Sequence, residues 1–155
     1  MEAKNKYYMP QFCPAFWDWL HMANNQQKVF SIDKVREELQ KGSDPLAKWA
    51  ECHNKEFFLP YKPEVELALV MLSEWVNSPP LAYKREAIDV FLQSADLFLI
   101  AYAITYGHVV VTHEQPSDTR KKVKIPNVCE AMNVEWTTTF KMLLNEKACF
   151  VLEDL

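Results

Sequence analysis

The residues best placed for chemistry in this sequence stand directly behind an apolar run. Thr112, His113 and Glu114 follow Val109–Val111, which has the composition of a buried strand. Ligands of open parallel sheets bind beyond the carboxyl ends of the strands, so Glu114 occupies a position that chemistry favours. Thr112 offers a hydroxyl at the same place. A lone loop histidine such as His113 is more often neither a base nor a metal ligand.

A dense basic run follows the same strand and consists of Arg120, Lys121, Lys122 and Lys124. Side chains of this kind hold phosphate backbones, and the run lies just beyond the expected strand end. The more common explanation of a short basic run is a solvated loop. The formal net charge of -4 and the pI near 5.6 disfavour a globally basic nucleic-acid binder but leave room for a local basic patch.

Two further acids lie on expected helices. Asp96 stands in the first turn of the helix that leads into the strand, where a carboxylate commonly satisfies free N–H groups and the helix dipole. Glu38 is one turn from Val35, at the edge of a buried helix face, whereas Glu37 points away. The commoner role of such a residue is that of a solvated surface acid. Because the chain has 21 acidic residues, three separate acids prove little.

The elements that must position these residues alternate between helices and short apolar strands. Helices are expected over Pro14–Asn24, from Asp33 to Gly42, over Pro45–Cys52, between Pro63 and Pro79, around Ala87–Phe91, from Ala95 to Tyr106, over Pro126–Met132 and over Thr138–Asn145. Strands are expected at Lys28–Ile32, Glu56–Leu59, His108–Thr112, Val134–Trp136 and Ala148–Leu152. This alternation predicts a single α/β domain over residues 1–155, with a three-layer architecture and a mostly parallel sheet.

Several side chains have expected orientations. Ala87, Val90 and Phe91 should point inward, and Gly107 should close the helix that begins at Ala95. The strand His108–Thr112 should be a central strand covered on both faces. The aromatic group of residues 16, 17 and 19 has helical spacing and fits the core or a partner surface.

Composition excludes several classes of protein. The apolar fraction of 49% and the charged fraction of 25% are those of a globular protein. Gly42 and Gly107 are the only glycines, so a Walker loop or a GxGxxG fingerprint is impossible. No run of about 18 apolar residues predicts a membrane span. The absence of an apolar leader and of any CxxC pair favours a cytoplasmic location without membrane contact.

Five segments, taken in order along the chain, form a fairly specific set. They are Phe12–Leu20, Val29–Leu39, Ala95–Ala101, Val109–Glu114 and Lys121–Cys129. Together they resemble a PIN-like subfamily that has long carried only the label of a domain of unknown function, and they are similar to the toxin nucleases of the VapC type. The resemblance covers nearly the whole chain.

The resemblance implies a function and a set of site residues. PIN domains are metal-dependent ribonucleases whose acids hold Mg²⁺ or Mn²⁺ at the carboxyl end of a parallel sheet, and hard cations of this kind prefer carboxylate oxygen. By residue, Asp96, Glu38 and Glu114 match the catalytic and metal-binding acids, and Thr112 matches a nearby hydroxyl. The basic run, namely Arg120, Lys121, Lys122 and Lys124, would contact RNA. The expected partners are an RNA substrate, an antitoxin protein and a second copy of the chain in a homodimer.

One part of the family pattern has no match in this sequence. The pattern begins with a short apolar strand that ends in an aspartate, whereas the sequence begins at Met1 within or just after that point. A misassigned start, a truncation and a naturally short member remain alternative explanations. Two other functions also stay open: a catalytically degenerate PIN-like module that binds RNA or a protein without cleavage, and an unrelated α/β protein.

Overall fold

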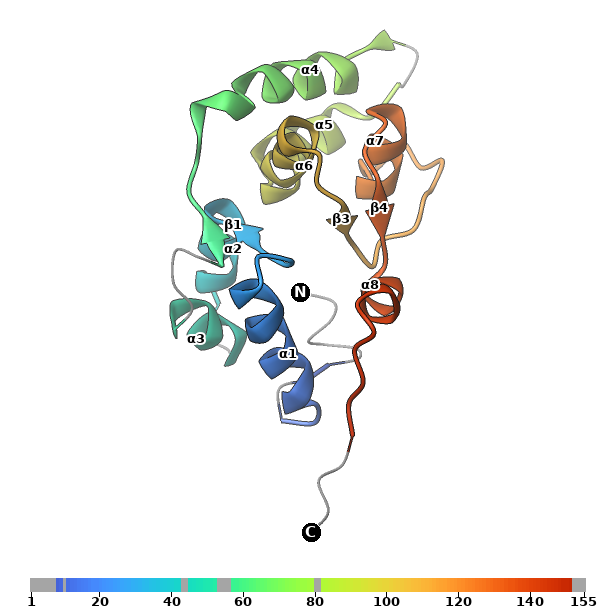
Figure 1. Ribbon diagram of the computed structural model, residues 1–155. Coiled ribbons are helices and arrows are strands. Elements are labelled where there is room, and N and C mark those ends of the chain that lie inside the picture. The colour runs from blue at the N-terminus through green and yellow to red at the C-terminus, as the bar shows by residue number, and fades with distance from the viewer. Residues whose placement is uncertain (1–7, 10, 43–44, 53–56, 80–81, 152–155) are drawn as a thin grey trace. The chain divides into compact units, whose positions relative to one another are not determined.

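The computed structural model describes residues 8–9, 11–42, 45–52, 57–79 and 82–151. The chain forms two compact units. Unit 1 consists of Met1–Pro60 and Thr138–Leu155, and contains α1 (Pro14–Asn25), β1 (Ser31–Ile32), α2 (Asp33–Gln40), α3 (Pro45–Cys52), β2 (Phe58–Leu59) and α8 (Thr139–Asn145). Unit 2 consists of Tyr61–Thr137, and contains the 3-10 helix η2 (Pro63–Val65), α4 (Glu66–Val76), α5 (Arg85–Gln93), α6 (Ala95–Tyr106), β3 (Val110–Val111), α7 (Ile125–Ala131) and β4 (Trp136–Thr137) (Figure 1).

Each unit contains one pair of parallel strands. In unit 1, β1 pairs with β2, with Ser31 opposite Phe58. In unit 2, β3 pairs with β4, with Val110 opposite Trp136, and the two strands lie side by side in Figure 1. The prediction of a mixed α/β chain with parallel pairing is therefore confirmed, although each strand has only two residues.

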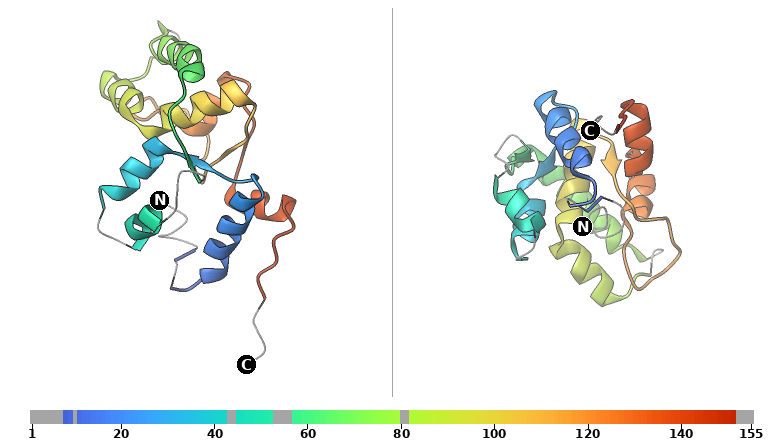
Figure 2. Two further views of the ribbon diagram at one scale, coloured as in Figure 1. Left: turned by 60° about the vertical axis from the view of Figure 1, so that its left-hand side comes forward. Right: turned by 90° about the horizontal axis from the view of Figure 1, so that it is seen from below.

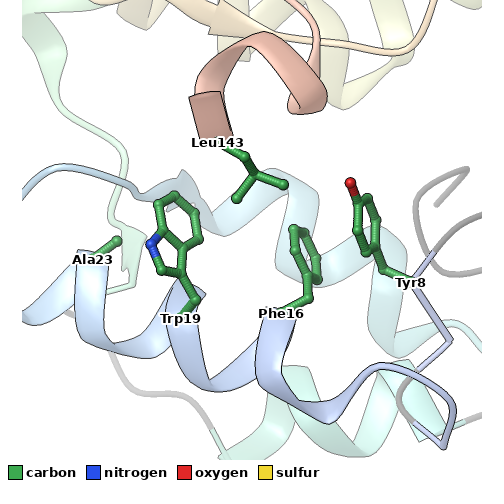
Figure 3. Close-up of a cluster of buried hydrophobic side chains, with 5 residues drawn as sticks. All are labelled: Tyr8, Phe16, Trp19, Ala23 and Leu143. Carbon is green, nitrogen blue, oxygen red and sulfur yellow. The ribbon is translucent and has the colours of Figure 1, made fainter. Parts of the chain in front are cut away.

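Aromatic side chains build the core of unit 1. Tyr8 stacks on Phe16 of α1 with ring centroids 4.1 Å apart, and Trp19 and Ala23 extend the same face of the helix. Leu143 of α8 points at this face from the other side (Figure 3). The 16, 19 and 23 positions are spaced at three and four residues, so one stripe of α1 is buried. The aromatic group of the sequence thus forms core, with Trp19 only 7% exposed.

A second aromatic group lies around α3 in the same unit. Trp49 makes edge-on contacts with Trp17 and with Phe57, at centroid distances of 5.1 Å in both cases. Trp17 also donates a hydrogen bond from Nε1 to the Tyr8 carbonyl at 2.8 Å. Helices α2 and α3 lie side by side in Figure 2. Edge-on aromatic contacts of this kind add to simple area burial, so β2 is fixed by packing from α3.

Helix α6 is the centre of unit 2. It packs against α4, α5, α7 and β3, and its sequence is apolar on every side. Small residues such as Ala101 and Ala103 allow this close approach, and both are almost fully buried. Gly107 ends the helix with φ of 69°, a conformation that costs glycine little, and its N–H donates to the Ala103 carbonyl. The predicted closure of this helix is confirmed.

Strand β3 has one covered face, not two. Val110 is 4% exposed and Thr112 is also buried, whereas Val109 and Val111 are 45% and 37% exposed. Successive residues of a strand point to opposite faces, so this alternation is the one expected of a sheet with one solvated side. The prediction of a strand covered on both faces is wrong. Three identical valines conceal the alternation in the sequence.

Two other predictions are wrong. Val90 does not point inward but is 67% exposed on α5, whereas its neighbours Ala87 and Phe91 are buried as expected. Residues 148–151 form no strand, because the backbone turns after α8 at Lys147 (φ 54°), where the Ala148 N–H donates to Leu143. The last residue of that predicted strand, Leu152, lies outside the described residues, as does Glu56 of the predicted strand Glu56–Leu59.

No single helix among the described residues is both long and apolar enough to cross a membrane; only α5 and α6 taken together, bent by 66°, meet that test of length and composition.

Candidate functional site

Thr112 fixes the backbone at the end of β3. Its own N–H donates to the Thr137 carbonyl at 2.9 Å, which extends the pairing of β3 with β4 by one residue. Its Oγ1 accepts a hydrogen bond from the Glu114 N–H at 3.1 Å. A hydroxyl that accepts from the residue two positions later forms a local turn, so Thr112 sets the direction in which Glu114 leaves the strand.

The carboxylate of Glu114 joins three donors. Its Oε2 accepts from the backbone N–H of Ile125 at 3.0 Å. Its Oε1 accepts from Nζ of Lys122 and from Nζ of Lys124, the latter at 3.2 Å. Ile125 is the first residue of α7, where N–H groups lack a partner within the helix. Glu114 therefore caps α7 from eleven residues away and neutralises two lysines.

These contacts decide the protonation of Glu114. Burial raises the pKa of this carboxyl, since its side chain is only 17% exposed. The hydrogen bonds from Lys122 and from the Ile125 N–H, together with the lysine charge, lower the pKa and outweigh burial. The net result is a pKa below the ordinary glutamate value, so Glu114 is an anion at neutral pH.

The segment between Glu114 and α7 is an ordered loop. The Ser117 N–H donates to Oδ1 of Asn127 at 3.0 Å, and the Thr119 N–H donates to the Ser117 hydroxyl at 3.3 Å. Val123 is 5% exposed and anchors the loop in the core of unit 2. The loop is thus held by a carboxylate, an amide and an apolar side chain, which give its basic residues defined positions.

The four basic residues of this loop divide into two pairs. Lys122 and Lys124 point back to Glu114. Arg120 and Lys121 are exposed and make no ion pair within the described residues. The Arg120 guanidinium carbon lies 5.7 Å from the ring centroid of Tyr83, and its carbonyl accepts from the Lys84 N–H at 2.9 Å. Only the second pair presents its charge outward.

Residues 1–150 match a family model described as "Domain of unknown function (DUF4411)". The chain belongs to the DUF4411 family. No curated protein and no solved structure matches the sequence. The description of the DUF4411 family assigns no activity.

The other predicted acids occupy the expected helices. Asp96 lies in the first turn of α6 and is half-buried. The Ser94 side chain does not cap that helix, because its hydroxyl donates instead to the Phe91 carbonyl. Glu38 is half-buried on α2, while Glu37 is exposed and pairs with Lys34 at 2.9 Å. The contrast predicted between the two neighbouring glutamates is confirmed.

The structure brings together Thr112, Glu114, Lys122 and Lys124 within unit 2. Asp96 belongs to the same unit, whereas Glu38 belongs to unit 1. Among the residues that the structure describes, no group of three or more histidine, cysteine, aspartate or glutamate side chains is arranged to hold a metal ion.

Sequence reasoning missed the partners of the basic loop. Tyr83, Lys84 and Asn127 carry no motif, and Tyr83 and Lys84 lie more than thirty residues before Arg120. Their roles arise from tertiary contacts across unit 2. The one available signal was the aromatic residue directly before two cations, Tyr83-Lys-Arg85, a combination that also suits RNA.

Proposed function

We propose that this DUF4411 protein is a PIN-type, metal-dependent endoribonuclease and the toxin of a toxin–antitoxin pair. The observation that carries the proposal is the order within unit 2: Asp96 opens α6, α6 leads into β3, and Glu114 follows the strand end. An outward-facing basic pair, Arg120 and Lys121, lies in the next loop. Two of the three proposed acids and the cations for one phosphodiester substrate thus belong to unit 2, whereas Glu38 belongs to unit 1.

The proposed architecture is the three-layer PIN-like fold. Two parallel strand pairs with helices before and after each strand support it. The antitoxin and a second copy of the chain are the proposed protein partners, and the cytoplasm is the proposed location. The exposed residues Leu67 and Val70 of α4 offer apolar surface in unit 2 for such contacts.

The proposed metal is Mg²⁺ or Mn²⁺, and the chemistry of the donor set suits it. Asp96, Glu38 and Glu114 supply carboxylate oxygens, which hard cations prefer. A divalent ion held by Asp96 and Glu114, both of unit 2, would lower the pKa of a water molecule and neutralise charge on the phosphate. Thr112 orients the backbone of Glu114 through its hydroxyl. Arg120 and Lys121 would bind the phosphates on either side of the scissile bond.

A second function, RNA binding without cleavage, is favoured by a specific observation. Both oxygens of Glu114 already accept hydrogen bonds, one from α7 and one from two lysines. In that role Glu114 organises the basic loop and is not a metal ligand. Such a module needs only the outward-facing cations, and its affinity for RNA would fall with added salt but would not depend on metal.

One assay separates the two functions. RNA cleavage would be measured with Mn²⁺, with and without a chelator, for the unaltered chain, Asp96→Asn, Glu114→Gln and Glu38→Gln. Glu37→Gln is the matched control, since Glu37 is the exposed neighbour of Glu38. The ribonuclease proposal expects cleavage that requires metal and falls by at least tenfold in Asp96→Asn and Glu38→Gln, with no change in Glu37→Gln.

The outcomes point in different directions. Metal-dependent cleavage that disappears in Asp96→Asn supports the ribonuclease. Equal cleavage by all variants would indicate a contaminating nuclease and overturn the assignment of these acids. RNA binding that survives a chelator, with no cleavage by any form, would replace the ribonuclease by the binding module.

A further inference from the structure

Two segments far apart in the sequence meet at Arg120. The Lys84 N–H donates to the Arg120 carbonyl at 2.9 Å, which ties the entrance of α5 to the basic loop. The Arg120 guanidinium lies over the Tyr83 ring, and Tyr83 in turn contacts Trp75 of α4 at a centroid distance of 6.2 Å. The Arg120 guanidinium therefore contacts a tyrosine ring that itself packs against Trp75, and the Arg120 backbone is fixed by a hydrogen bond.

The basic residues near Arg120 differ in whether they form an ion pair. Lys84, Arg120 and Lys121 are exposed, and none of them forms an ion pair within the described residues. Arg85, the next residue after Lys84, is paired with Asp89 at 3.1 Å. The backbone hydrogen bond between Lys84 and Arg120 makes Lys84, Arg120 and Lys121 neighbours in unit 2, although two come from a loop and one from a helix entrance.

This arrangement suits a phosphodiester chain better than a compact anion. Guanidinium forms two parallel hydrogen bonds to a phosphate and also stacks on flat rings. Single-stranded RNA offers both partners, since its phosphates repeat along the strand and its bases are unstacked. The contact with the Tyr83 ring restricts the Arg120 guanidinium before the ligand arrives, which reduces the cost of ordering it on binding.

We infer that Lys84, Arg120 and Lys121 form a binding subsite for single-stranded RNA, with Tyr83 as a positioning residue beneath Arg120. The inference rests on the proposed RNA function. It changes which residues of the basic run are expected to contact RNA. Arg120 and Lys121 contact the ligand, Lys84 joins them from outside the run, and Lys122 and Lys124 hold the loop through Glu114.

The test is a binding titration in the presence of a chelator, which removes metal-dependent cleavage from the readout. A fluorescein-labelled single-stranded oligoribonucleotide would be titrated with the full chain, and affinity would be followed by anisotropy over a series of salt concentrations. For single strands, each phosphate that a cation neutralises makes the slope of log affinity against log salt steeper by about 0.7. Lys84→Gln, Arg120→Gln and Lys121→Gln should each make the slope shallower by about that amount.

Tyr83→Leu has a distinct expected signature, because it removes no charge. The affinity should fall by about two- to fivefold, the range of an exposed cation–π contact, while the salt slope stays nearly constant. In the Arg120→Gln background, Tyr83→Leu should cause no further decrease in affinity, since the residue acts through Arg120. Equal decreases in both backgrounds would overturn the positioning role of Tyr83.

Lys62→Gln is the matched control. Lys62 is also an exposed cation over a tyrosine ring in unit 2, 5.2 Å from the Tyr106 centroid, but it is not part of this subsite. Its replacement should leave RNA affinity unchanged. Folding of every variant would be checked by its thermal unfolding midpoint, so that a misfolded variant is not scored as a binding defect.

Failure of the inference and failure of the proposed function are distinguishable. RNA binding that weakens in the three glutamine variants but is never followed by cleavage with Mn²⁺ supports the subsite and overturns the ribonuclease. Cleavage with unchanged RNA affinity in all three variants overturns the subsite and supports the ribonuclease. Binding of poly-glutamate as tight as that of RNA would overturn the inference in favour of an acidic protein partner.

Discussion

The segments next to the parallel strands are held in place by different interactions in the two units. In unit 1, β2 and α1 are fixed by aromatic packing, in which Phe16, Trp49 and Phe57 contact other rings. In unit 2, the loop after β3 is fixed by an anion, because Glu114 accepts hydrogen bonds from two lysines and from α7. Unit 2 also has an apolar core around α6, but charge holds the loop in which its candidate chemistry lies.

The two units should therefore differ in how strongly their stability depends on pH and salt. Apolar burial is nearly independent of pH and of moderate salt, whereas a carboxylate with lysine partners responds to both. The region of unit 2 proposed to bind RNA is therefore the one whose order changes with solution conditions. Unit 1, in contrast, carries Glu38 on α2, a helix that packs against α3.

The largest expected effect is in the aromatic core of unit 1. Phe16→Ala should lower the free energy of unfolding by about 3–5 kcal/mol, because Phe16 is 3% exposed and its removal leaves a cavity beside Tyr8 and Leu143. Urea unfolding followed by circular dichroism measures this. Phe12→Ala is the control, since Phe12 is 82% exposed and should change the value by no more than about 0.5 kcal/mol. Similar decreases in both variants would contradict the core described above.

A smaller effect is expected at Glu114. Glu114→Gln keeps the shape but removes the charge that Lys122 and Lys124 contact, so stability should fall by about 1.5–3 kcal/mol. Hydrogen exchange of the Ile125 amide should accelerate at the same time, because its acceptor is weakened. Asp118→Asn, a change of an exposed acid in the same loop, serves as the control and should affect neither measurement. An unchanged Ile125 exchange rate would show that the Glu114 carboxylate does not hold the start of α7.

The smallest effect concerns pH. The folded pKa of Glu114 lies below its unfolded value, so its contribution is complete above the unfolded pKa and disappears as pH falls through the folded pKa. The stability difference between the unaltered chain and Glu114→Gln should thus be constant from pH 7 to about pH 5 and shrink below that. Unfolding titrations at stepwise lower pH measure it. A difference that grows on acidification would mean that the pKa is raised.

Helix ends and helix faces could be predicted from the sequence. Pro14 at the start of α1, Gly107 at the end of α6 and the buried positions Ala87 and Phe91 of α5 follow from local backbone chemistry and from a period of 3.6 residues. Strand faces were harder. In a run of three valines every position is apolar, so the sequence does not reveal that Val109 and Val111 face outward.

The candidate site was likewise predictable from the sequence only in part. The sequence by itself determined which residues have suitable chemistry and the elements that carry them: Asp96 on a helix start, Glu114 behind a strand, and a basic run after it. Only the tertiary structure decided that Glu114 neutralises Lys122 and Lys124, and that Arg120 contacts Tyr83 and Lys84. The physical reason is that type and spacing fix local geometry, whereas the partner of a long charged side chain depends on which segments the fold brings within hydrogen-bonding distance.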